Sequence, residues 1–581
     1  MSVDSGNIIG VSGNMVAVET TGNTMQNEVA YILHGEERLK AEVVRISAAA
    51  VYLQVFESTR GLKVGDAVEF SRALLSVQVG PGLLGQVFDG LQNPLPKLAD
   101  EYGSFLPRGV SLEPLDRSRI WGFTPAVKAG DEVVAGQALG SVAESLFEHR
   151  IMVPFDWPGR LRVEEIVPAG DYALDFPVAQ LRDEKGALRQ ATMVFAWPVK
   201  LPITAYRDRL VPREPLITKV RIIDSFYPVA KGGTFCVPGP FGAGKTVLQQ
   251  IISRYAEVDV VIIAACGERA GEVVETLKEF PHLEDPRSGR SLMERTIIIC
   301  NTSSMPVAAR EASVYTAVTL GEYYRQMGLD VLMLADSTSR WAQAMRELSG
   351  RLEEIPGEEA FPAYLESRIA EFYERAGLVE LTDGSQGSLT ISGTVSPAGG
   401  SFEEPVTQAT LKVVGAFLGL SQERADARRY PAIHPLESWS NYSSAISGDM
   451  IEALRALLFK GDEVRQMMMV VGEEGTALED FEIYLQAEFV DNVYLQQNAF
   501  DAVDAASPPQ RQMRVFGKMH RILMEDLRFE DKEQIRAFFS RMRQLFIDWN
   551  YIAMEDDRFV AQEEKIDQLI AERTEVGTGV Q

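Results

Sequence analysis

One short run of residues constrains the fold of this chain more than any other feature. Residues 239–246 are Gly-Pro-Phe-Gly-Ala-Gly-Lys-Thr and fit the pattern G-x-x-x-x-G-K-[ST]. That pattern also occurs by chance, so its surroundings decide what it means. The β-rich run 234–237 precedes it, and apolar residues recur at helical spacing after it. We therefore predict a strand, a glycine-rich loop and a helix, which together are typical of a parallel α/β sheet.

The loop itself predicts phosphate binding. Its glycines allow successive backbone N–H groups to turn toward an anion, and the dipole of the following helix adds to the attraction. We expect Lys245 to reach the β- and γ-phosphates and the Thr246 hydroxyl to bind Mg²⁺. The alternative, a glycine-rich turn capped by a threonine, fits the flanking strand and helix less well. The residues predicted to contact the nucleotide here are Gly239, Pro240, Phe241, Gly242, Ala243, Gly244, Lys245, Thr246 and Val247.

Two carboxylates follow apolar runs that we interpret as buried parallel strands. Residues 330–336 end in Asp336, which we expect to hold the water shell of the metal, although it could instead cap the next helix. Residues 260–266 are followed by Glu268 and Arg269, at the edge where open α/β sheets bind ligands. Glu268 could polarise the attacking water and Arg269 could balance phosphate charge. A surface ion pair explains the spacing equally well.

The patterning divides the chain into five segments. Short alternating strands dominate the first 75 residues, a second β-rich stretch without helical period follows, and helices replace strands near the C-terminus. We predict 1–75 as an N-terminal β-barrel, 76–109 as a glycine-rich connector, 110–190 as an inserted β-rich barrel-sandwich (bulge) domain, 191–440 as the P-loop (RecA-like) α/β nucleotide-binding domain and 441–581 as a C-terminal helical domain.

Charge and cysteine usage exclude several classes of protein. The chain has 57 Lys and Arg against 83 Asp and Glu, a net charge of −26, so we expect no nucleic-acid partner and no anionic membrane surface. The N-terminus shows no signal peptide, and no apolar run is long enough to span a membrane. The three cysteines have neither metal-site nor disulfide spacing, and we interpret them as core thiols.

Further blocks of residues lie in order along the chain. They are Gly-Pro-Gly-Leu-Leu-Gly at 80–85, Asn-Thr-Ser-Ser-Met-Pro-Val-Ala-Ala-Arg-Glu at 301–311, Ala-Asp-Ser-Thr-Ser-Arg-Trp-Ala at 335–342 and Pro-Ala-Ile-His-Pro-Leu-Glu-Ser-Trp-Ser at 431–440. With the P-loop, they make the chain similar, nearly end to end, to the catalytic A subunit of V-type (vacuolar/archaeal-type) rotary ATPases. The β-rich stretch lies where these subunits carry an insertion that F-type β subunits lack.

The resemblance implies roles for individual residues. Lys245, Glu268 and Arg269 match the catalytic lysine, carboxylate and arginine of the family, with ATP or ADP as substrate. Thr246 and Asp336 match its Mg²⁺ ligands, Asp336 through water. One departure follows the catalytic glutamate, where the common Gly-Glu-Arg-Gly-Asn-Glu is here Gly-Glu-Arg-Ala-Gly-Glu at 267–272.

The resemblance also implies a pair of aromatic residues around adenine. Tyr430 and Phe500 match the positions that flank the base, and a flat ring suits stacking on a purine, although either ring could belong to the core. His434 occupies a signature position that is often Asn or Asp. We expect it to support its loop by hydrogen bonds and to take no part in catalysis.

The resemblance further implies an assembly. The chain would alternate with a B subunit in an A3B3 hexamer that supplies the arginine finger, so the isolated chain should hydrolyse ATP poorly. Central-stalk and peripheral-stalk subunits would connect it indirectly to the ion-translocating sector. That places the chain on the cytoplasmic face of a membrane as a peripheral subunit, coupling ATP hydrolysis or synthesis to H⁺ or Na⁺ transport.

Three alternatives share parts of this pattern. A Rho-like RNA translocase has the same ATPase core but needs a basic nucleic-acid channel, which the charge disfavours. A protein-export ATPase would lack the segment 110–190. The non-catalytic B subunit would have lost the P-loop lysine and the Gly-Glu-Arg element, and both are present here.

Overall fold

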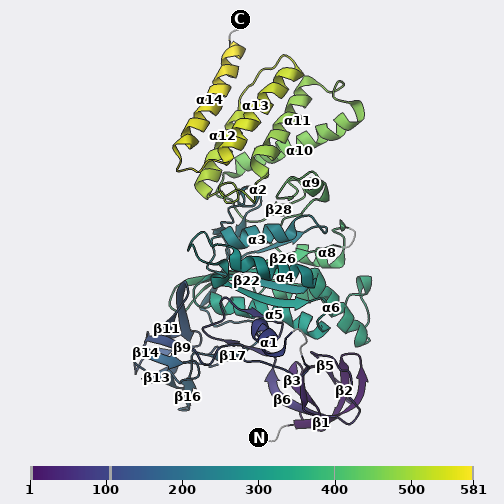
Figure 1. Ribbon diagram of the computed structural model, residues 1–581, viewed down its shortest axis with the longest axis vertical. Helices are drawn as coiled ribbons and strands as arrows, with labels where there is room; N and C mark the ends of the chain where they lie inside the picture. Colours follow the sequence, from purple (N-terminus) through teal and green to yellow (C-terminus); the bar gives the residue numbers. More distant parts are fainter. Residues whose placement is uncertain (1–3, 104–106, 398–399, 579–581) are drawn as a thin grey trace.

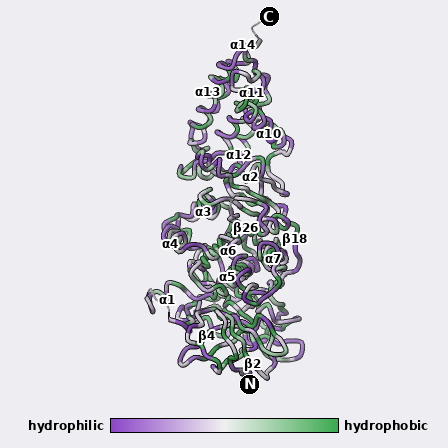
Figure 2. Tube along the Cα trace, turned by 90° about the vertical axis from the view of Figure 1, so that its right-hand side faces the viewer, coloured by the Kyte–Doolittle hydropathy of each residue, from purple (hydrophilic) through white to green (hydrophobic). Residues whose placement is uncertain are grey.

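The computed structural model describes residues 4–103, 107–397 and 400–578. Three tiers follow one another along an elongated molecule, from an N-terminal β-barrel through a central sheet with helices on it to a C-terminal set of helices (Figure 1). The inserted β-rich domain lies beside the barrel tier. The view turned by 90° shows the same order, with helix α5 (Val307–Arg325) and strand β26 (Gln386–Val395) in the middle tier (Figure 2). The predicted fold class is confirmed.

The N-terminal tier is a closed antiparallel barrel with strand order β1-β2-β5-β4-β3-β6. Alternate residues point inward and form a separate apolar core, as period-2 patterning requires. Closure pairs both edges of the sheet, so no strand edge is left open. The strands are β1 (Asp4–Ser12), β2 (Met15–Thr20), β3 (Glu28–His34), β4 (Glu37–Ile46), β5 (Val51–Val55) and β6 (Ala67–Leu74).

The inserted domain consists of two four-stranded antiparallel sheets, ordered β10-β13-β15-β16 and β12-β11-β9-β14. Residues of the first sheet form a small core with Leu139 of β11, while most buried residues of the second sheet join the core beneath α5. The strands are β9 (Ile120–Pro125), β10 (Glu132–Val133), β11 (Ala138–Glu144), β12 (Phe147–Met152), β13 (Leu161–Ile166), β14 (Gly170–Ala173), β15 (Ala179–Arg182) and β16 (Leu188–Ala191).

The connector contributes to the central domain, which the sequence did not indicate. Strand β8 (Val87–Phe88) pairs in parallel with β23 (Thr296–Thr302) and forms the edge of the central sheet. Strand β7 (Ser76–Val79) pairs with β17 (Phe195–Pro198), so the two ends of the insertion are held together. Helix α1 (Leu95–Tyr102) follows β8.

The central sheet has the order β28-β27-β21-β26-β24-β22-β23-β8, and its middle strands are parallel. Both faces are buried. In β22, Val260, Ile262 and Ala264 join the core under α5, whereas Val261 and Ile263 join the core on the opposite face. The remaining strands are β18 (Asp208–Leu210), β19 (Pro215–Leu216), β20 (Val229–Ala230), β21 (Thr234–Pro238), β22 (Val260–Glu268), β24 (Asp330–Asp336), β25 (Gly377–Glu380), β27 (Ala416–Phe417) and β28 (Trp439–Ser440).

Helices cover this sheet and form the C-terminal tier. The apolar core on the α3 face continues into the C-terminal helices, so the two tiers share one core. All three cysteines are buried, as predicted. The helices are α2 (Arg221–Phe226), α3 (Lys245–Tyr255), α4 (Ala270–Glu279), α6 (Thr338–Arg351), α7 (Leu365–Tyr373), α8 (Pro405–Leu411), α9 (Gln422–Asp426), α10 (Gly448–Val471), α11 (Leu478–Val490), the π-helix η5 (Asp491–Leu495), α12 (Pro509–Met524), α13 (Lys532–Asn550) and α14 (Asp557–Thr578); the 3-10 turns are η1 (Phe280–His282), η2 (Leu292–Arg295) and η3 (Glu358–Ala360).

Candidate functional site

The glycine-rich loop connects β21 to α3, as its flanking residues predicted. β21 ends at Pro238, and α3 begins at Lys245. Gly242 and Gly244 have φ angles of 82° and 89°, in the left-handed region that side chains with a Cβ rarely adopt. A Cβ on Gly244 would also lie 3.4 Å from the Tyr430 ring. The loop therefore needs both glycines for its backbone conformation, while a Cβ on Gly244 would make only an ordinary contact with Tyr430.

The Lys245 ammonium closes back on its own loop. Its Nζ donates hydrogen bonds to the carbonyl oxygens of Gly239 at 2.7 Å and Pro240 at 3.1 Å. Burial lowers the pKa of Lys245, and the carboxylates of Asp336 and Glu268 oppose that shift. This arrangement holds a positive charge at the start of α3, where the helix dipole also favours an anion.

The two predicted carboxylates lie at one edge of the sheet. β22 and β24 are neighbouring parallel strands that end in Glu268 and Asp336. Both side chains line a cavity of about 40 Å³ together with Thr246 and Glu272. The Thr394 hydroxyl donates to Asp336 Oδ1 at 2.6 Å. A hydroxyl and a carboxylate facing one small cavity are hard oxygen donors of the kind that Mg²⁺ prefers.

Burial raises the pKa of both carboxyl groups, and negative neighbours add to the rise. The pKa of Glu268 rises to about 7, mainly because it is buried and further because Asp336 and Glu272 are negative. Burial likewise raises the pKa of Asp336, while the Thr394 hydrogen bond and Lys245 oppose the shift. A carboxyl group that titrates near neutral pH is suited to exchange protons with a water molecule.

Arg269 is not among the residues that line this cavity. It is exposed, and its guanidinium carbon lies 5.0 Å from the centroid of the Phe241 ring, in a cation–π contact. The Ala270 side chain, where the sequence departs from the common pattern, lies outside the described residues.

A second cavity of about 560 Å³ opens on the other side of the loop. Tyr430 and Phe500 both line it, together with Gly242, Gly244 and Val247 of the loop and α3. The Phe500 ring is 93% exposed and that of Tyr430 42% exposed, so neither belongs to the core. Two exposed aromatic rings beside the phosphate loop form a site on which a flat base can stack.

Residues that sequence reasoning missed hold this second cavity together. Buried Arg221 forms an ion pair with Asp504, and its Nε donates to the Tyr494 carbonyl oxygen at 2.9 Å. The Gln497 backbone N–H donates to the Tyr430 carbonyl oxygen at 2.8 Å. The partners are far apart in sequence, so the chain offered no local signal for them.

Two residues from the sequence blocks, Arg340 and His434, have defined places in the structure. Arg340, from the block at 335–342, lies close enough to Glu268 for its charge to lower the pKa of that carboxyl, against the net upward shift. His434 Nδ1 accepts hydrogen bonds from the backbone N–H groups of Leu436 at 3.2 Å and Glu437 at 3.1 Å. Supporting its loop in this way is the part we expected for His434.

Family models match four parts of the chain. Residues 219–440 match the nucleotide-binding domain of the ATP synthase alpha/beta family, and residues 8–72 match its beta-barrel domain. Residues 112–200 match an ATP synthase alpha/beta subunit barrel-sandwich domain. Residues 448–536 match the C-terminal domain of V and A type ATP synthase.

Relatives match nearly the whole chain. The V-type ATP synthase alpha chain of Treponema denticola is 60% identical over 99% of this chain and 98% of its own. The V-type ATP synthase alpha chain of Borrelia duttonii is 60% identical over 97% of this chain and 98% of its own. The V-type ATP synthase alpha chain 1 of Treponema pallidum is 61% identical over 97% of this chain and 96% of its own. Among solved structures, the assembled ATPase EscN of the enteropathogenic E. coli type III secretion system has a TM-score of 0.63 at 20% identity, covering 89% of this chain and 100% of that one. This last likeness concerns the fold alone.

Proposed function

This chain belongs to the V-type ATP synthase alpha chains of the ATP synthase alpha/beta family, and from that membership we propose which of its residues carry the chemistry. Chains of this kind are the catalytic nucleotide-binding subunits that couple ATP hydrolysis or synthesis to ion transport. The observation that supports our assignment is the shared edge of β21, β24 and β22, where Lys245, Asp336 and Glu268 meet.

In this proposal the protein positions the phosphates and neutralises their charge. Lys245 exchanges its loop carbonyls for the β- and γ-phosphate oxygens. Glu268 orients the attacking water and accepts its proton, for which it must be ionised. Arg269, on the exposed tip, turns toward the phosphates to balance the charge that develops there.

We further propose a Mg²⁺ ion at the cavity between α3 and β24. The Thr246 hydroxyl and the Asp336 carboxylate, the latter through water, are the residues that fit it. Bound there, the ion supplies positive charge to the phosphate oxygens. Among the described residues, no group of three or more His, Cys, Asp or Glu is placed to hold a metal, so the nucleotide and water complete its shell.

The proposed site for the adenine base also follows from membership of this family. Adenine is proposed to lie between Tyr430 and Phe500 in the 560 Å³ cavity, next to the loop that holds its phosphates.

The chain is part of a multi-subunit ATPase. We propose an alternating A3B3 hexamer with B subunits, stalk subunits that link it indirectly to the ion-translocating sector, and a place on the cytoplasmic face of a membrane. In the described part of the chain no helix has the length and apolar character to cross a bilayer.

The deciding experiment measures Mg²⁺-ATP turnover by the full-length chain assembled with its B subunit. Glu268→Gln should lower turnover by about 10²–10⁴-fold while nucleotide binding is retained, because water activation is lost and phosphate contacts are not. The matched control is Glu279→Gln on the exposed end of α4, where the carboxylate accepts a hydrogen bond from Gln250 Nε2 at 2.8 Å. Unchanged turnover in Glu268→Gln would refute the assignment.

A further inference from the structure

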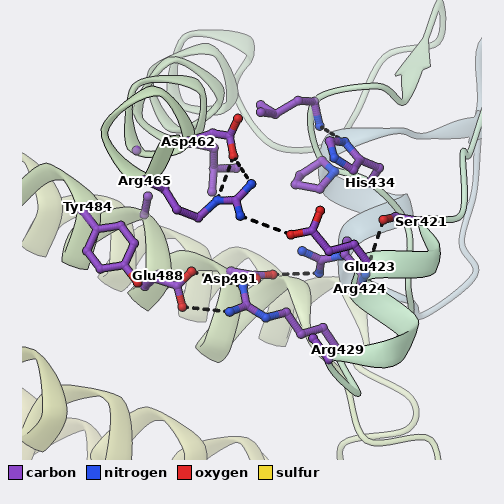
Figure 3. A pocket seen from close by; sticks show the side chains of 16 residues that line it. Ser421, Glu423, Arg424, Arg429, His434, Asp462, Arg465, Tyr484, Glu488 and Asp491 are labelled. Atoms are coloured by element: carbon purple, nitrogen blue, oxygen red, sulfur yellow. Dashed lines mark hydrogen bonds and ion pairs between the residues drawn. The ribbon is translucent and has the colours of Figure 1, made fainter. Parts of the chain in front are cut away.

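A cluster of ion pairs joins the α/β domain to the C-terminal helices (Figure 3). Arg424 Nη2 donates to Asp491 Oδ1 at 2.7 Å, and Arg429 Nη1 donates to Asp491 Oδ2. Arg429 Nη2 also donates to Glu488 Oε2 at 3.0 Å. We name these four residues the arginine clamp. Asp491 is only 4% exposed, and burying a carboxylate is costly unless it is paired in this way.

The clamp is adjacent to both walls of the base cavity. Arg429 directly precedes Tyr430, whose ring forms one wall. Asp491 begins the π-helix η5, and the chain beyond η5 passes through Gln497, which binds the Tyr430 backbone, to Phe500. A change at Asp491 is therefore transmitted toward Tyr430 through the arginines and toward Phe500 along the chain.

The backbone at Tyr430 needs outside support. Arg428 has a φ of 56°, a left-handed conformation that costs a non-glycine residue energy and persists only where its surroundings enforce it. Arg424 and Arg429, on either side of Arg428, are both fixed by Asp491. By holding the strained turn at Arg428 in place, these ion pairs also fix the direction in which the chain continues to Tyr430.

The contact between the domains here is partly polar. A cavity of about 160 Å³ lies beside the clamp and is lined from both sides, including Glu423 of α9 and Arg465 of α10, which form a more exposed ion pair at 3.1 Å. Leu458 and Ala487, which belong to the apolar core that the two tiers share, also line this cavity. π-Helical turns such as η5 also occur frequently at functional sites.

We propose that Arg429 and Asp491 are positioning residues for Tyr430: their ion pair fixes the turn that presents the Tyr430 ring to the base cavity and so sets the affinity of that cavity for the nucleotide. The inference rests on the proposed function, because it assumes that the base stacks on Tyr430.

The test is a double-mutant cycle on the full-length chain, with MgADP affinity measured by isothermal titration calorimetry. Arg429→Ala should weaken binding about tenfold, and Asp491→Asn should do the same. In a Tyr430→Ala background, Arg429→Ala should have no further effect, because Arg429 acts only through that ring. Arg429→Lys should restore part of the affinity, since it keeps the charge but not the paired contacts.

Two controls separate this effect from general destabilisation and from failure of the proposed function. Arg514→Ala breaks the Arg514–Glu563 pair inside the C-terminal helices and should leave MgADP affinity unchanged. Lys245→Ala should weaken binding by about 100-fold or more; if the unaltered chain does not bind MgADP, the proposed function fails. If it binds and Arg429→Ala binds equally well, or if the Arg429 and Tyr430 effects add, the positioning role is overturned.

Discussion

The phosphate end of the proposed site comes from the ends of strands in one sheet, whereas the base end comes from two loops of different domains. At the phosphate end, Lys245 follows β21 after the loop, and Glu268 and Asp336 are the last residues of β22 and β24. At the base end, Tyr430 and Phe500 reach one cavity only through contacts across a domain boundary. The phosphate end is thus fixed by the sheet, and the base end depends on how two domains are placed.

This difference has a consequence for motion. Parallel strands buried on both faces keep their ends in register, so the groups at the phosphate end stay close together. The side chains of Tyr430 and Phe500 are exposed and lie on loops, so no shared sheet fixes the distance between them.

The largest expected effect is at the phosphate end. Lys245→Ala removes the ammonium that would bind the β- and γ-phosphates, and MgADP affinity should fall by about 100-fold or more. Equilibrium binding to the full-length chain measures it. Lys278→Ala, on the exposed last turn of α4, is the matched control and should bind normally. Retained affinity in Lys245→Ala would break the comparison at its stronger end.

The metal prediction concerns the neighbouring strand. Asp336→Asn should raise the Mg²⁺ concentration needed for half-maximal turnover by about 10–100-fold, because a neutral amide holds the metal's water shell less well. Asp330→Asn, at the opposite end of β24, keeps the strand and should leave the Mg²⁺ requirement unchanged. Equal Mg²⁺ requirements in Asp336→Asn and the unaltered chain would remove the metal from this edge.

The phosphate end could be predicted from the sequence because its signals are local. The loop pattern, the apolar runs and the carboxylates that follow them each lie within about ten residues, and parallel topology then places the strand ends together. Strand β8 could not be predicted in this way, because two residues within a glycine-rich connector show no periodicity. Arg340 was part of a recognised block but its place beside Glu268 required the fold.

At the base end, only the resemblance to a known family singled out Tyr430 and Phe500. The contacts that position them, such as Arg221 with Asp504 and Gln497 with the Tyr430 carbonyl oxygen, join residues from different domains. No pattern of composition or spacing encodes such pairs, because each partner on its own has an ordinary sequence environment.

The raised pKa of Glu268 makes a prediction about stability. Its folded-state pKa of about 7 exceeds the ordinary value of 4.5, so the folded chain favours the protonated form. The stability that protonated Glu268 contributes is therefore fully present below pH 4.5 and is lost as the pH rises through 7. In the nucleotide-free chain, Glu268→Gln should therefore increase the free energy of unfolding at pH 8, on the order of 1–3 kcal/mol, and change it little at pH 5.

Thermal unfolding at the two pH values measures this effect. Glu279→Gln is again the control, since that carboxylate is exposed and should give no pH-dependent difference. A gain of equal size at both pH values would mean that packing, and not repulsion among the carboxylates, explains it. A gain at pH 8 alone would support the interpretation that the phosphate end is assembled at the cost of stability.

The smallest expected effect separates the two ends directly. Phe500→Ala should weaken MgADP binding by about 1 kcal/mol, the lower range for stacking of a base on an aromatic ring, and raise KM with kcat nearly unchanged. The same variant should bind Mg²⁺-tripolyphosphate normally, because that ligand has phosphates and no base. Since Phe500 is 93% exposed, Tm should not change. Phe459→Ala, an exposed phenylalanine on α10, is the matched control. Equal losses for MgADP and tripolyphosphate would show that Phe500 acts on the loop as a whole, and the two ends of the site would then be one unit.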